Sequence, residues 1–426
     1  MTSPQKRGEV SAFFVGKIKN EKKGSKMIFS LALIFIFGLI MSAVCQKLKL
    51  PGIIGMMFTG IILGPYMLDL LEGPILDISK DLRQIALIII LIKAGLSLDI
   101  DVLKRVGRPA LLMSFVPATF EIAGYTILAP FLLGISLNEA ALMGSVIAAV
   151  SPAVVVPRMV KLMETGFGTK QGIPQIITAG ASCDDIFVIV LFTAFLGSVK
   201  DNTMSFASLV DIPMSVVSGA IVGVLAGLLL ALIFEYFFNR GKYIRNSIKV
   251  IIILSVSFLL VSLEKAVEEC WAVSGLLAVI TMSIVLRTKG TGSVTKRLSE
   301  KFGKLWLAAE LLLFVLVGAA VDIRYTLGTG LNAVVLILLC LIFRGTGVFI
   351  SLLGTKLTKQ ERLFCIMSYM PKATVQAAIG SVPLAFGLAC GQIILSVAVL
   401  AIMITAPLGA ILMDHYYIKL LKKEDF

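Results

Sequence analysis

The segment Ser-Pro-Ala-Val-Val-Val-Pro (151–157) places Pro152 and Pro157 inside a long apolar run, and Met-Pro-Lys-Ala-Thr-Val-Gln (370–376) places Pro371 inside another. Proline lacks a backbone donor and interrupts a helix. Irregular backbone at membrane depth is tolerated only where protein or a water-filled cavity satisfies it. Interrupted helices at matching places in two halves of a chain are typical of a transporter's binding site. We therefore expect two broken, crossing helices, with a packing kink in an ordinary helix as the alternative.

Apolar runs of this kind recur through most of the chain. Of its 426 residues, 58% are hydrophobic and only 15% are charged, which is too little charge for a soluble protein of this size. A membrane-spanning helix needs about 20 mostly apolar residues. The sequence therefore predicts an all-α membrane protein with 13 transmembrane helices: 27–45, 51–68, 84–98, 110–133, 139–160, 173–197, 212–238, 248–264, 271–286, 305–322, 328–354, 363–386 and 391–414.

The distribution of basic residues predicts the orientation. The loops after the odd-numbered spans, with the adjoining span ends and the C-terminal tail, hold 24 of the 39 lysines and arginines, and the remaining loops hold five. Cytoplasmic loops carry the excess of lysine and arginine, so the C-terminus is expected in the cytoplasm. Residues 1–26 form a polar, basic N-terminal tail without a signal-peptide pattern. Thirteen spans place this basic tail outside, against the same rule.

Two pairs of segments suggest an internal repeat. Lys-Ala-Gly-Leu-Ser-Leu-Asp-Ile (93–100) resembles Leu-Val-Gly-Ala-Ala-Val-Asp-Ile (316–323) at an offset of 223, and the two proline segments match at an offset of 219. The paired spans are seven apart in order, so they cross in opposite directions. This pattern predicts two inverted-topology repeats of six spans, with the span 212–238 as a linker helix between them.

Two adjacent acids lie in the middle of the sixth span. Asp184 and Asp185 interrupt the run from Ile176 to Phe192. A charge at the centre of a membrane helix costs about 2.5–3.5 kcal/mol on the insertion scale, and a purely structural buried ion pair is the alternative to a functional role. Burial favours a protonated carboxyl, and a nearby cation favours the charged form. Protons and a small alkali cation can therefore compete for one carboxylate, which provides a mechanism for exchange.

Three of the other charges inside predicted spans are candidates for the site. At the repeat offset of 223, Glu121 falls on Arg344, and we expect these two to pair near the pseudo-symmetry axis. Lys372, beside the second proline break, is expected to face the aspartates. The alternative for Lys372 is that it neutralises the negative ends of the broken half-helices.

Other classes of protein are disfavoured by what the sequence contains. The net charge of +13 is better explained by basic loops at an anionic cytoplasmic lipid surface than by nucleic acid. The sequence has no phosphate-binding glycine loop and no cofactor motif, and its one histidine, His415, lies at the end of the last span. An intramembrane aspartyl protease needs two aspartates from different helices that share a proton. We therefore predict that the chain is not an enzyme and needs no cofactor.

The proline segments, Gly-Ile-Pro (172–174), Cys-Asp-Asp-Ile (183–186) and Met-Pro-Lys-Ala-Thr-Val-Gln-Ala-Ala (370–378) together resemble the monovalent cation:proton antiporter superfamily. The resemblance is to its Na⁺/H⁺ antiporter branch with paired aspartates, and it runs from about residue 28 to residue 414.

This resemblance implies a division of the chain into working parts. Segments 27–98 and 248–322 would form a dimerisation domain of a homodimer, and segments 110–197 and 328–414 a core that moves in an elevator-like alternation. Asp185 would be the main ligand of Na⁺ or Li⁺, with Asp184 as its companion, and Ser151 and unwound backbone near Val154 would complete the site. Many relatives carry lysine where this chain has Arg344, and arginine cannot release a proton, so the stoichiometry stays open unless Lys372 takes over that role.

Two other transport functions are left open by the sequence. A K⁺/H⁺ antiporter or K⁺ efflux system of the same superfamily would use the same aspartates, although its regulated members carry a domain after the last span, where few residues follow here. A symporter for an organic anion on a similar fold is less well supported, because an anion favours a basic site. We expect a multi-pass protein of a bacterial inner or plasma membrane.

Overall fold

A computed structural model describes residues 27–98, 106–200, 206–242, 244–267, 273–290 and 292–423, so the predicted tail 1–26 lies outside the described residues. Within these ranges the chain is helical apart from its connections and one isolated β-bridge, between Phe167 and Lys423. The helices are Met27–Lys47, α2 (Gly52–Leu63), α3 (Gly73–Asp77), α4 (Ser79–Ser97), α6 (Arg108–Met113), α7 (Val116–Leu133), α8 (Leu137–Ile147), α9 (Pro152–Thr165), α10 (Ile173–Lys200), α11 (Phe206–Asn239), α12 (Asn246–Val267), α13 (Gly275–Lys289), α14 (Gly292–Ala319), α15 (Ile323–Ser351), α16 (Lys359–Ser368), α17 (Thr374–Gly380), α18 (Val382–Ala385) and α19 (Gly391–Leu420).

Among the described residues, nine helical segments are long and apolar enough to cross a membrane. They are Met27–Lys47, Arg108–Leu133, Leu137–Thr165, Ile173–Val199, Val217–Asn239, Asn246–Glu264, Val294–Ala319, Gly330–Ser351 and Gly391–Leu420. Each corresponds to a span predicted from the sequence, so the prediction of an all-helical membrane fold is confirmed.

The other four predicted spans form helices that are shorter, more charged or divided. Spans 51–68 and 271–286 contain α2 and α13, which have 12 and 15 residues. Span 84–98 lies in α4, whose 19 residues include several charges. Span 363–386 is divided among α16, α17 and α18. The number 13 therefore stays a prediction.

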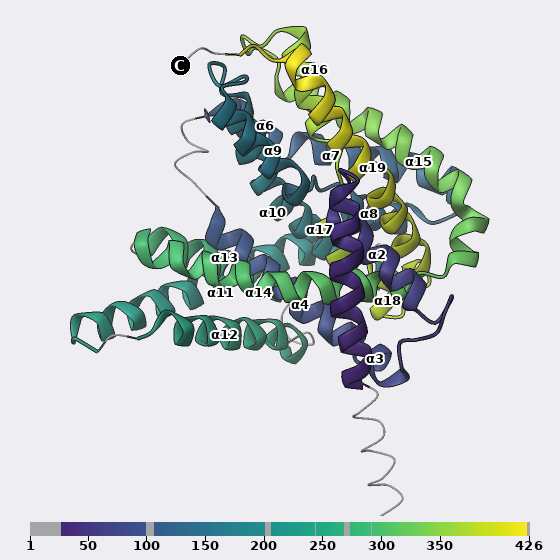
Figure 1. The fold of residues 1–426 in the computed structure, drawn as a ribbon. Coiled ribbons are helices and arrows are strands. Elements are labelled where there is room, and N and C mark those ends of the chain that lie inside the picture. The colour runs from purple at the N-terminus through teal and green to yellow at the C-terminus, as the bar shows by residue number, and fades with distance from the viewer. Residues whose placement is uncertain are drawn as a thin grey trace, which may run out of the picture.

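The helices pack in two groups, which Figure 1 shows side by side. In one group α14 packs on α2 and α4, and α13 packs on α4 and α11. In the other group α7 packs on α15 and α8, α10 packs on α8 and α9, and α19 packs on α15 and α16. The short helix α17 contacts α8 and α19 of the second group and also α4 and α14 of the first, so it lies where the groups meet.

Two of the predicted spans, 139–160 and 363–386, are interrupted in their middle. The helix that starts at Leu137 stops after Ile147, and residues 148–151 are not helical before α9 begins at Pro152. The chain from Lys359 is interrupted in the same way between Ser368 and Thr374. Pro152 is the first residue of its helix, where its missing N–H costs nothing.

Pro157 was expected to break a helix, and this prediction is wrong. Pro157 lies inside α9, which continues to Thr165. One lost donor leaves a single carbonyl, at Ala153, without its usual partner, and membrane helices tolerate this where neighbouring groups can compensate. Pro371 does lie in non-helical backbone.

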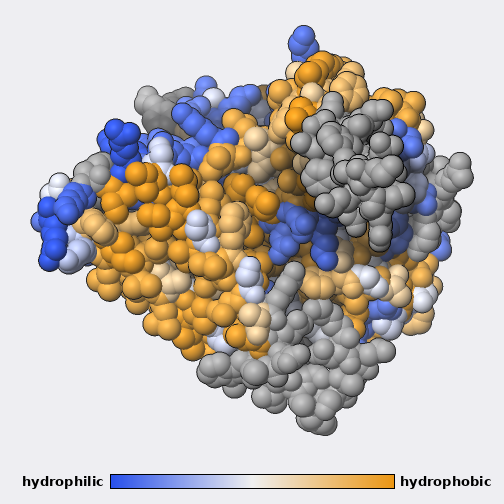
Figure 2. Space-filling model, turned by 90° about the horizontal axis from the view of Figure 1, so that it is seen from below, coloured by the Kyte–Doolittle hydropathy of each residue, from blue (hydrophilic) through white to orange (hydrophobic). Residues whose placement is uncertain are grey.

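The outer surface is largely apolar. In the view of Figure 2, hydrophobic residues cover most of the visible area. The membrane segments Met27–Lys47, Val217–Asn239 and Asn246–Glu264 have the smallest buried shares of the nine segments found among the described residues, at 28%, 22% and 33%. These segments offer the most apolar surface to lipid or to a partner.

Candidate functional site

The two interruptions meet in the interior of the second helix group. The backbone N–H of Ser151 donates to the carbonyl of Pro371 at 2.8 Å. The side-chain amide of Gln376 donates to the carbonyls of Ile147 and Ala149, at 2.9 and 2.6 Å. Buried backbone groups must find partners, and here each interruption satisfies groups of the other.

The paired aspartates lie next to this crossing, in the middle of the continuous helix α10. Asp184 is completely buried, and its Oδ2 accepts a hydrogen bond of 2.7 Å from the backbone N–H of Val150. Asp185 is 7% exposed. Neighbouring residues of a helix point about 100° apart, so only the first aspartate reaches the interruption before α9 in this way.

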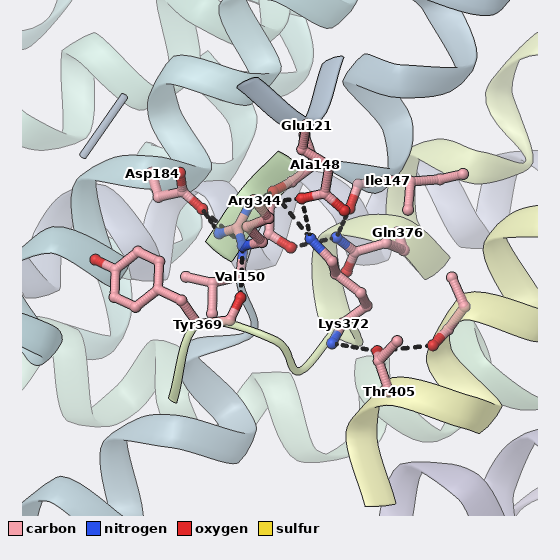
Figure 3. A network of polar contacts seen from close by, with 12 residues as sticks. Glu121, Ile147, Ala148, Val150, Asp184, Arg344, Tyr369, Lys372, Gln376 and Thr405 are labelled. Atoms are coloured by element: carbon pink, nitrogen blue, oxygen red, sulfur yellow. Dashed lines mark hydrogen bonds and ion pairs between the residues drawn. The ribbon is translucent and has the colours of Figure 1, made fainter. Parts of the chain in front are cut away.

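Arg344 is the centre of the polar network, as Figure 3 shows. Its Nη2 lies 3.0 Å from Asp184 Oδ2, and its Nη1 lies 2.7 Å from Glu121 Oε2. The same side chain donates from Nε to the carbonyl of Tyr369 at 2.5 Å and from Nη1 to the carbonyl of Ala148. The guanidinium presents its donors in a fixed fork, which suits these divergent acceptors. The structure thus has Glu121 and Arg344, which the repeat offset relates, in direct contact.

Lys372 occupies a different place from the one expected. Its Nζ lies 2.5 Å from Glu121 Oε2 and 3.2 Å from the carbonyl of Ala148. Its backbone N–H donates to Thr405 Oγ1 at 2.9 Å. The prediction that Lys372 faces the aspartates is therefore wrong in this structure, because the Arg344 guanidinium takes that position.

Both cations also bond carbonyls at helix ends. Ala148 follows the last residue of α8, and Tyr369 follows the last residue of α16. Arg344 donates to both carbonyls, and Lys372 donates to that of Ala148. The C-terminus of a helix carries a partial negative charge, so the cations stabilise the ends of the broken helices as well as the acids.

Oxygen atoms without partners remain beside this network. Asp185 Oδ1, Asp184 Oδ1 and Ser151 Oγ are buried and have no hydrogen-bond partner among the described residues. Ser151 is completely buried and is the residue before α9, yet its hydroxyl does not cap that helix. Unpaired buried oxygens are costly, so these atoms are the ones on which a bound cation or proton would act.

Val154 does not supply free backbone in this structure. It lies in the first turn of α9, and its carbonyl accepts a hydrogen bond of 2.8 Å from Arg158 Nη1. The non-helical backbone is at 148–151 instead, because the helix restarts directly at Pro152. The expectation of unwound backbone near Val154 is therefore wrong by a few residues.

Some residues of the network were missed in the sequence. Gln376 and Tyr369 lie in or beside the second proline segment, and a buried polar side chain next to a helix break is a signal that could have identified Gln376. Thr405 lies in α19 with no such signal, although its Oγ1 accepts from the backbone of Lys372.

The five acidic and basic residues at the crossing include one more acid than base. Glu121, Asp184 and Asp185 provide three acids, and Arg344 and Lys372 provide two cations. The two cations have ion-pair partners in Glu121 and Asp184, so in a count with all five groups ionised the excess formal charge is that of Asp185. Within the described ranges, no group of three or more His, Cys, Asp and Glu side chains is placed to hold a metal. A monovalent cation at the crossing would therefore depend on few carboxylates together with hydroxyl or backbone oxygens.

Comparisons with known proteins agree with this architecture. Residues 30–414 match the family described as "Sodium/hydrogen exchanger, transmembrane". The chain is 32% identical to sodium/hydrogen exchanger 9B2 of Homo sapiens over 391 residues, which is 88% of this chain and 70% of the human protein. It is 33% identical to the protein of the same name from Xenopus tropicalis over 359 residues, which is 82% of this chain but only 65% of the frog protein.

The fold is also similar to that of a solved structure, the sodium proton antiporter MjNhaP1 from Methanocaldococcus jannaschii at pH 8. The TM-score is 0.79 at 20% sequence identity, and the similar region covers 93% of this chain and 99% of that one. The family match extends over most of the chain and over the interrupted helices and aspartates described above. The chain is therefore a multi-pass integral membrane protein that belongs to the sodium/hydrogen exchanger family.

Proposed function

We propose that this protein is a secondary active antiporter that exchanges Na⁺ or Li⁺ for H⁺ by alternating access. The cation and the proton would compete for Asp185, with Asp184 as its companion and Ser151 as a further oxygen ligand. The names of the human, frog and archaeal proteins all state sodium/proton exchange. The single observation that carries the proposal is the buried Oδ1 of Asp185, which has no hydrogen-bond partner among the described residues.

The charge balance supports exchange of one cation for one proton. When Glu121 and Asp184 stay paired with Arg344 and Lys372, one negative charge is left, on Asp185. A single Na⁺ or a single H⁺ neutralises that charge. Arg344 cannot release a proton at physiological pH, so it does not add a second exchangeable proton. We therefore propose electroneutral exchange with Arg344 as a fixed charge.

The finer topology is also a proposal. We propose 13 spans in two inverted repeats, with α11 as the linker helix. Two capping boxes support the repeat: Ser136 and Glu139 start α8, and Thr358 and Glu361 start α16, at an offset of 222. The interruptions follow these helices at similar distances, and the Glu121–Arg344 ion pair joins residues 223 apart.

The two helix groups supply candidates for a fixed and a moving part. We propose that segments 27–98 and 248–322 form the dimerisation domain of a homodimer, and that segments 110–197 and 328–414 form a core that moves like an elevator. The exposed apolar surfaces of Met27–Lys47 and Asn246–Glu264 support a partner on that side. Anionic lipids would contact the basic loops, which we place with the C-terminus in the cytoplasm. The bacterial membrane expected from the sequence stays a prediction.

Exchange in proteoliposomes with an enclosed pH dye tests the proposal. We expect Na⁺ and Li⁺ to drive proton movement, and Asp185→Asn to abolish it. Asp414→Asn is the matched control, because Asp414 is an exposed aspartate paired with Arg158, and it should exchange at the wild-type rate. An Asp185→Asn variant with full exchange would remove the site assignment.

Two additions to this experiment decide the ion and the stoichiometry. Adding K⁺ in place of Na⁺ tests the alternative, a K⁺/H⁺ antiporter or K⁺ efflux system of the same superfamily. Setting the membrane potential with an ionophore tests electroneutrality, because a one-for-one exchange rate should not change with potential. An organic-anion symporter is less well supported, since the one uncompensated charge at the crossing is negative.

A further inference from the structure

An open groove lies on the outer side of the crossing between α7 and α15. It is a cavity of about 420 Å³, and six residues line it: Thr119, Phe120, Ala123, Ile342, Phe343 and Thr346. Four of these side chains, two from each helix, are exposed. The groove lies near the middle of the membrane segments Arg108–Leu133 and Gly330–Ser351, and therefore at the depth of the hydrocarbon core.

The groove and the Glu121–Arg344 ion pair belong to one pseudo-symmetric crossing. Each lining residue of α7 has a counterpart in α15 at the same 223-residue offset as that ion pair: Thr119 and Ile342, Phe120 and Phe343, Ala123 and Thr346. At about 100° per residue, the side chain of Glu121 points some 200° away from that of Thr119. The ion pair thus joins the two helices on the inner side, and the groove separates them on the outer side.

Reciprocal packing connects the groove walls to the crossing itself. A Cβ at Gly124 would lie 2.9 Å from Phe343 Cγ, and a Cβ at Gly347 would lie 3.2 Å from Phe120 Cβ. Each phenylalanine therefore packs against a glycine of the opposite helix. A group inserted between the phenylalanines would therefore press on the two helices that carry Glu121 and Arg344.

The side chains that line the groove offer water no free hydrogen-bond donor. The hydroxyl of Thr119 donates to the carbonyl of Phe115 at 2.8 Å, and that of Thr346 donates to the carbonyl of Ile342 at 2.9 Å. An ordered water needs two to four polar partners, and both lining hydroxyls already use their protons within their own helices. The mostly apolar lining therefore favours an apolar occupant.

We propose that one acyl chain of a membrane phospholipid occupies this groove as a bound ligand and acts as a wedge on the α7–α15 crossing. A second copy of the chain fits less well, because a stable protein interface buries about 1,200–2,000 Å² and this groove has only six lining residues. The broad apolar faces lie on other segments, with buried shares of 22% and 28%. The proposal concerns lipid binding and goes beyond ion exchange.

Photolabelling of the reconstituted full-length protein tests the occupant. One phosphatidylcholine probe carries a diazirine at mid-chain, and a second carries it in the headgroup. We expect the mid-chain probe to label the peptides around Ala123 and Thr346, the label to survive exchange into detergent, and unlabelled phospholipid to compete it away. Ala123→Phe fills the groove and should reduce the label about tenfold, which corresponds to about 1.4 kcal/mol of binding free energy.

Ile127→Phe is the matched control, because Ile127 is an exposed residue one turn further along α7 and outside the groove. It should keep the wild-type label, and both variants should keep the wild-type melting temperature. Equal labelling by the headgroup probe, label that detergent removes, equal label in both variants, or cross-links between two copies through these peptides would each overturn the proposal. Because no ion is involved, the outcome is independent of whether the protein exchanges Na⁺.

Discussion

The backbone N–H of Ser151 bonds the carbonyl of Pro371 and so joins two interrupted helices that are 220 positions apart in the sequence. Neither interruption could stay at membrane depth alone, because its free N–H and C=O groups would find no water. Arg344 and Gln376 extend the same arrangement, since both donate to carbonyls at the helix ends. The polar crossing is therefore a structural element as well as the candidate ion site.

The two aspartates should differ in their effects on stability. Asp184 accepts hydrogen bonds from Arg344 and from the N–H of Val150, so Asp184→Ala leaves a buried guanidinium and an amide with fewer partners. Breaking a buried ion pair costs about 3–5 kcal/mol, and the melting temperature in detergent should fall. Within the part of the chain that the structure describes, Asp185 has no ion-pair partner, so Asp185→Ala should leave the melting temperature unchanged or raise it.

Asp414→Ala provides the control for this comparison. Asp414 pairs with Arg158 at 2.9 Å, and its side chain is 51% exposed, so the pair contributes about 0–1 kcal/mol. Equal losses in Asp184→Ala and Asp185→Ala would contradict the division of roles between the aspartates.

Arg344 and Glu121 should be strongly coupled. Arg344→Ala removes the guanidinium from two carboxylates and two carbonyls, and we expect it to lower stability more than turnover. A double-mutant cycle with Glu121→Ala should give a coupling energy of about 0.5–3 kcal/mol in the melting free energies. Arg344→Lys should not restore the wild-type stability, because an ammonium lacks the fixed fork of donors. Additive losses would show that Arg344 and Glu121 have no net interaction despite the short distance between them.

The sequence predicts this pair but not its neighbour. The repeat offset relates Glu121 to Arg344 by position alone, and the structure has them in contact at 2.7 Å. Lys372 has no such counterpart, so its direction depends on the path of the chain through the break, which a pattern of apolar residues does not determine. The same reason explains why the expectations for Val154 and Pro157 were wrong. Proline indicates an interruption nearby, but the helix restarts at Pro152 and continues through Pro157.

The hydropathy of the sequence predicts long spans better than short ones. The nine long segments were identifiable from hydropathy. The 12 residues of α2 and the divided segment around α17 are too short to be distinguished from buried soluble helices by composition. Gln376 and Thr405 complete the site through contacts with distant segments, and one sequence without relatives contains no direct record of such contacts.

Gln376 should contribute to stability through the carbonyls that it satisfies. Gln376→Leu keeps the side chain's approximate size but removes the donors to Ile147 and Ala149 and the acceptor for the N–H of Ala373. Each buried group left without a partner costs about 1–3 kcal/mol, so a large fall in melting temperature is expected. Gln392→Leu is the control, since Gln392 Nε2 has no partner among the described residues. A similar loss in both variants would mean that the crossing does not depend on Gln376.

Tyr369 and Gly180 should be coupled through steric overlap, so that a substitution at one position relieves the effect of a substitution at the other. Tyr369 is completely buried, its ring lies 5.4 Å from the Arg344 guanidinium carbon, and its hydroxyl has no partner among the described residues. A Cβ at Gly180, one turn before Asp184, would overlap this hydroxyl and lie 2.9 Å from Met113 Cβ. Gly180→Ala should therefore cost about 1–3 kcal/mol through overpacking.

Tyr369→Phe removes only the hydroxyl and should be neutral or slightly stabilising, because an unpaired buried polar group is lost. Combined with Gly180→Ala, it should restore part of the lost stability and, with it, exchange activity, since the overlap with the hydroxyl disappears while that with Met113 remains. Melting temperatures of the two single variants and the double variant measure this rescue. A double variant no more stable than Gly180→Ala alone would mean that α10 is not positioned against Tyr369. The Tyr369 ring would then not help to set the distance between Asp184 and the broken helices.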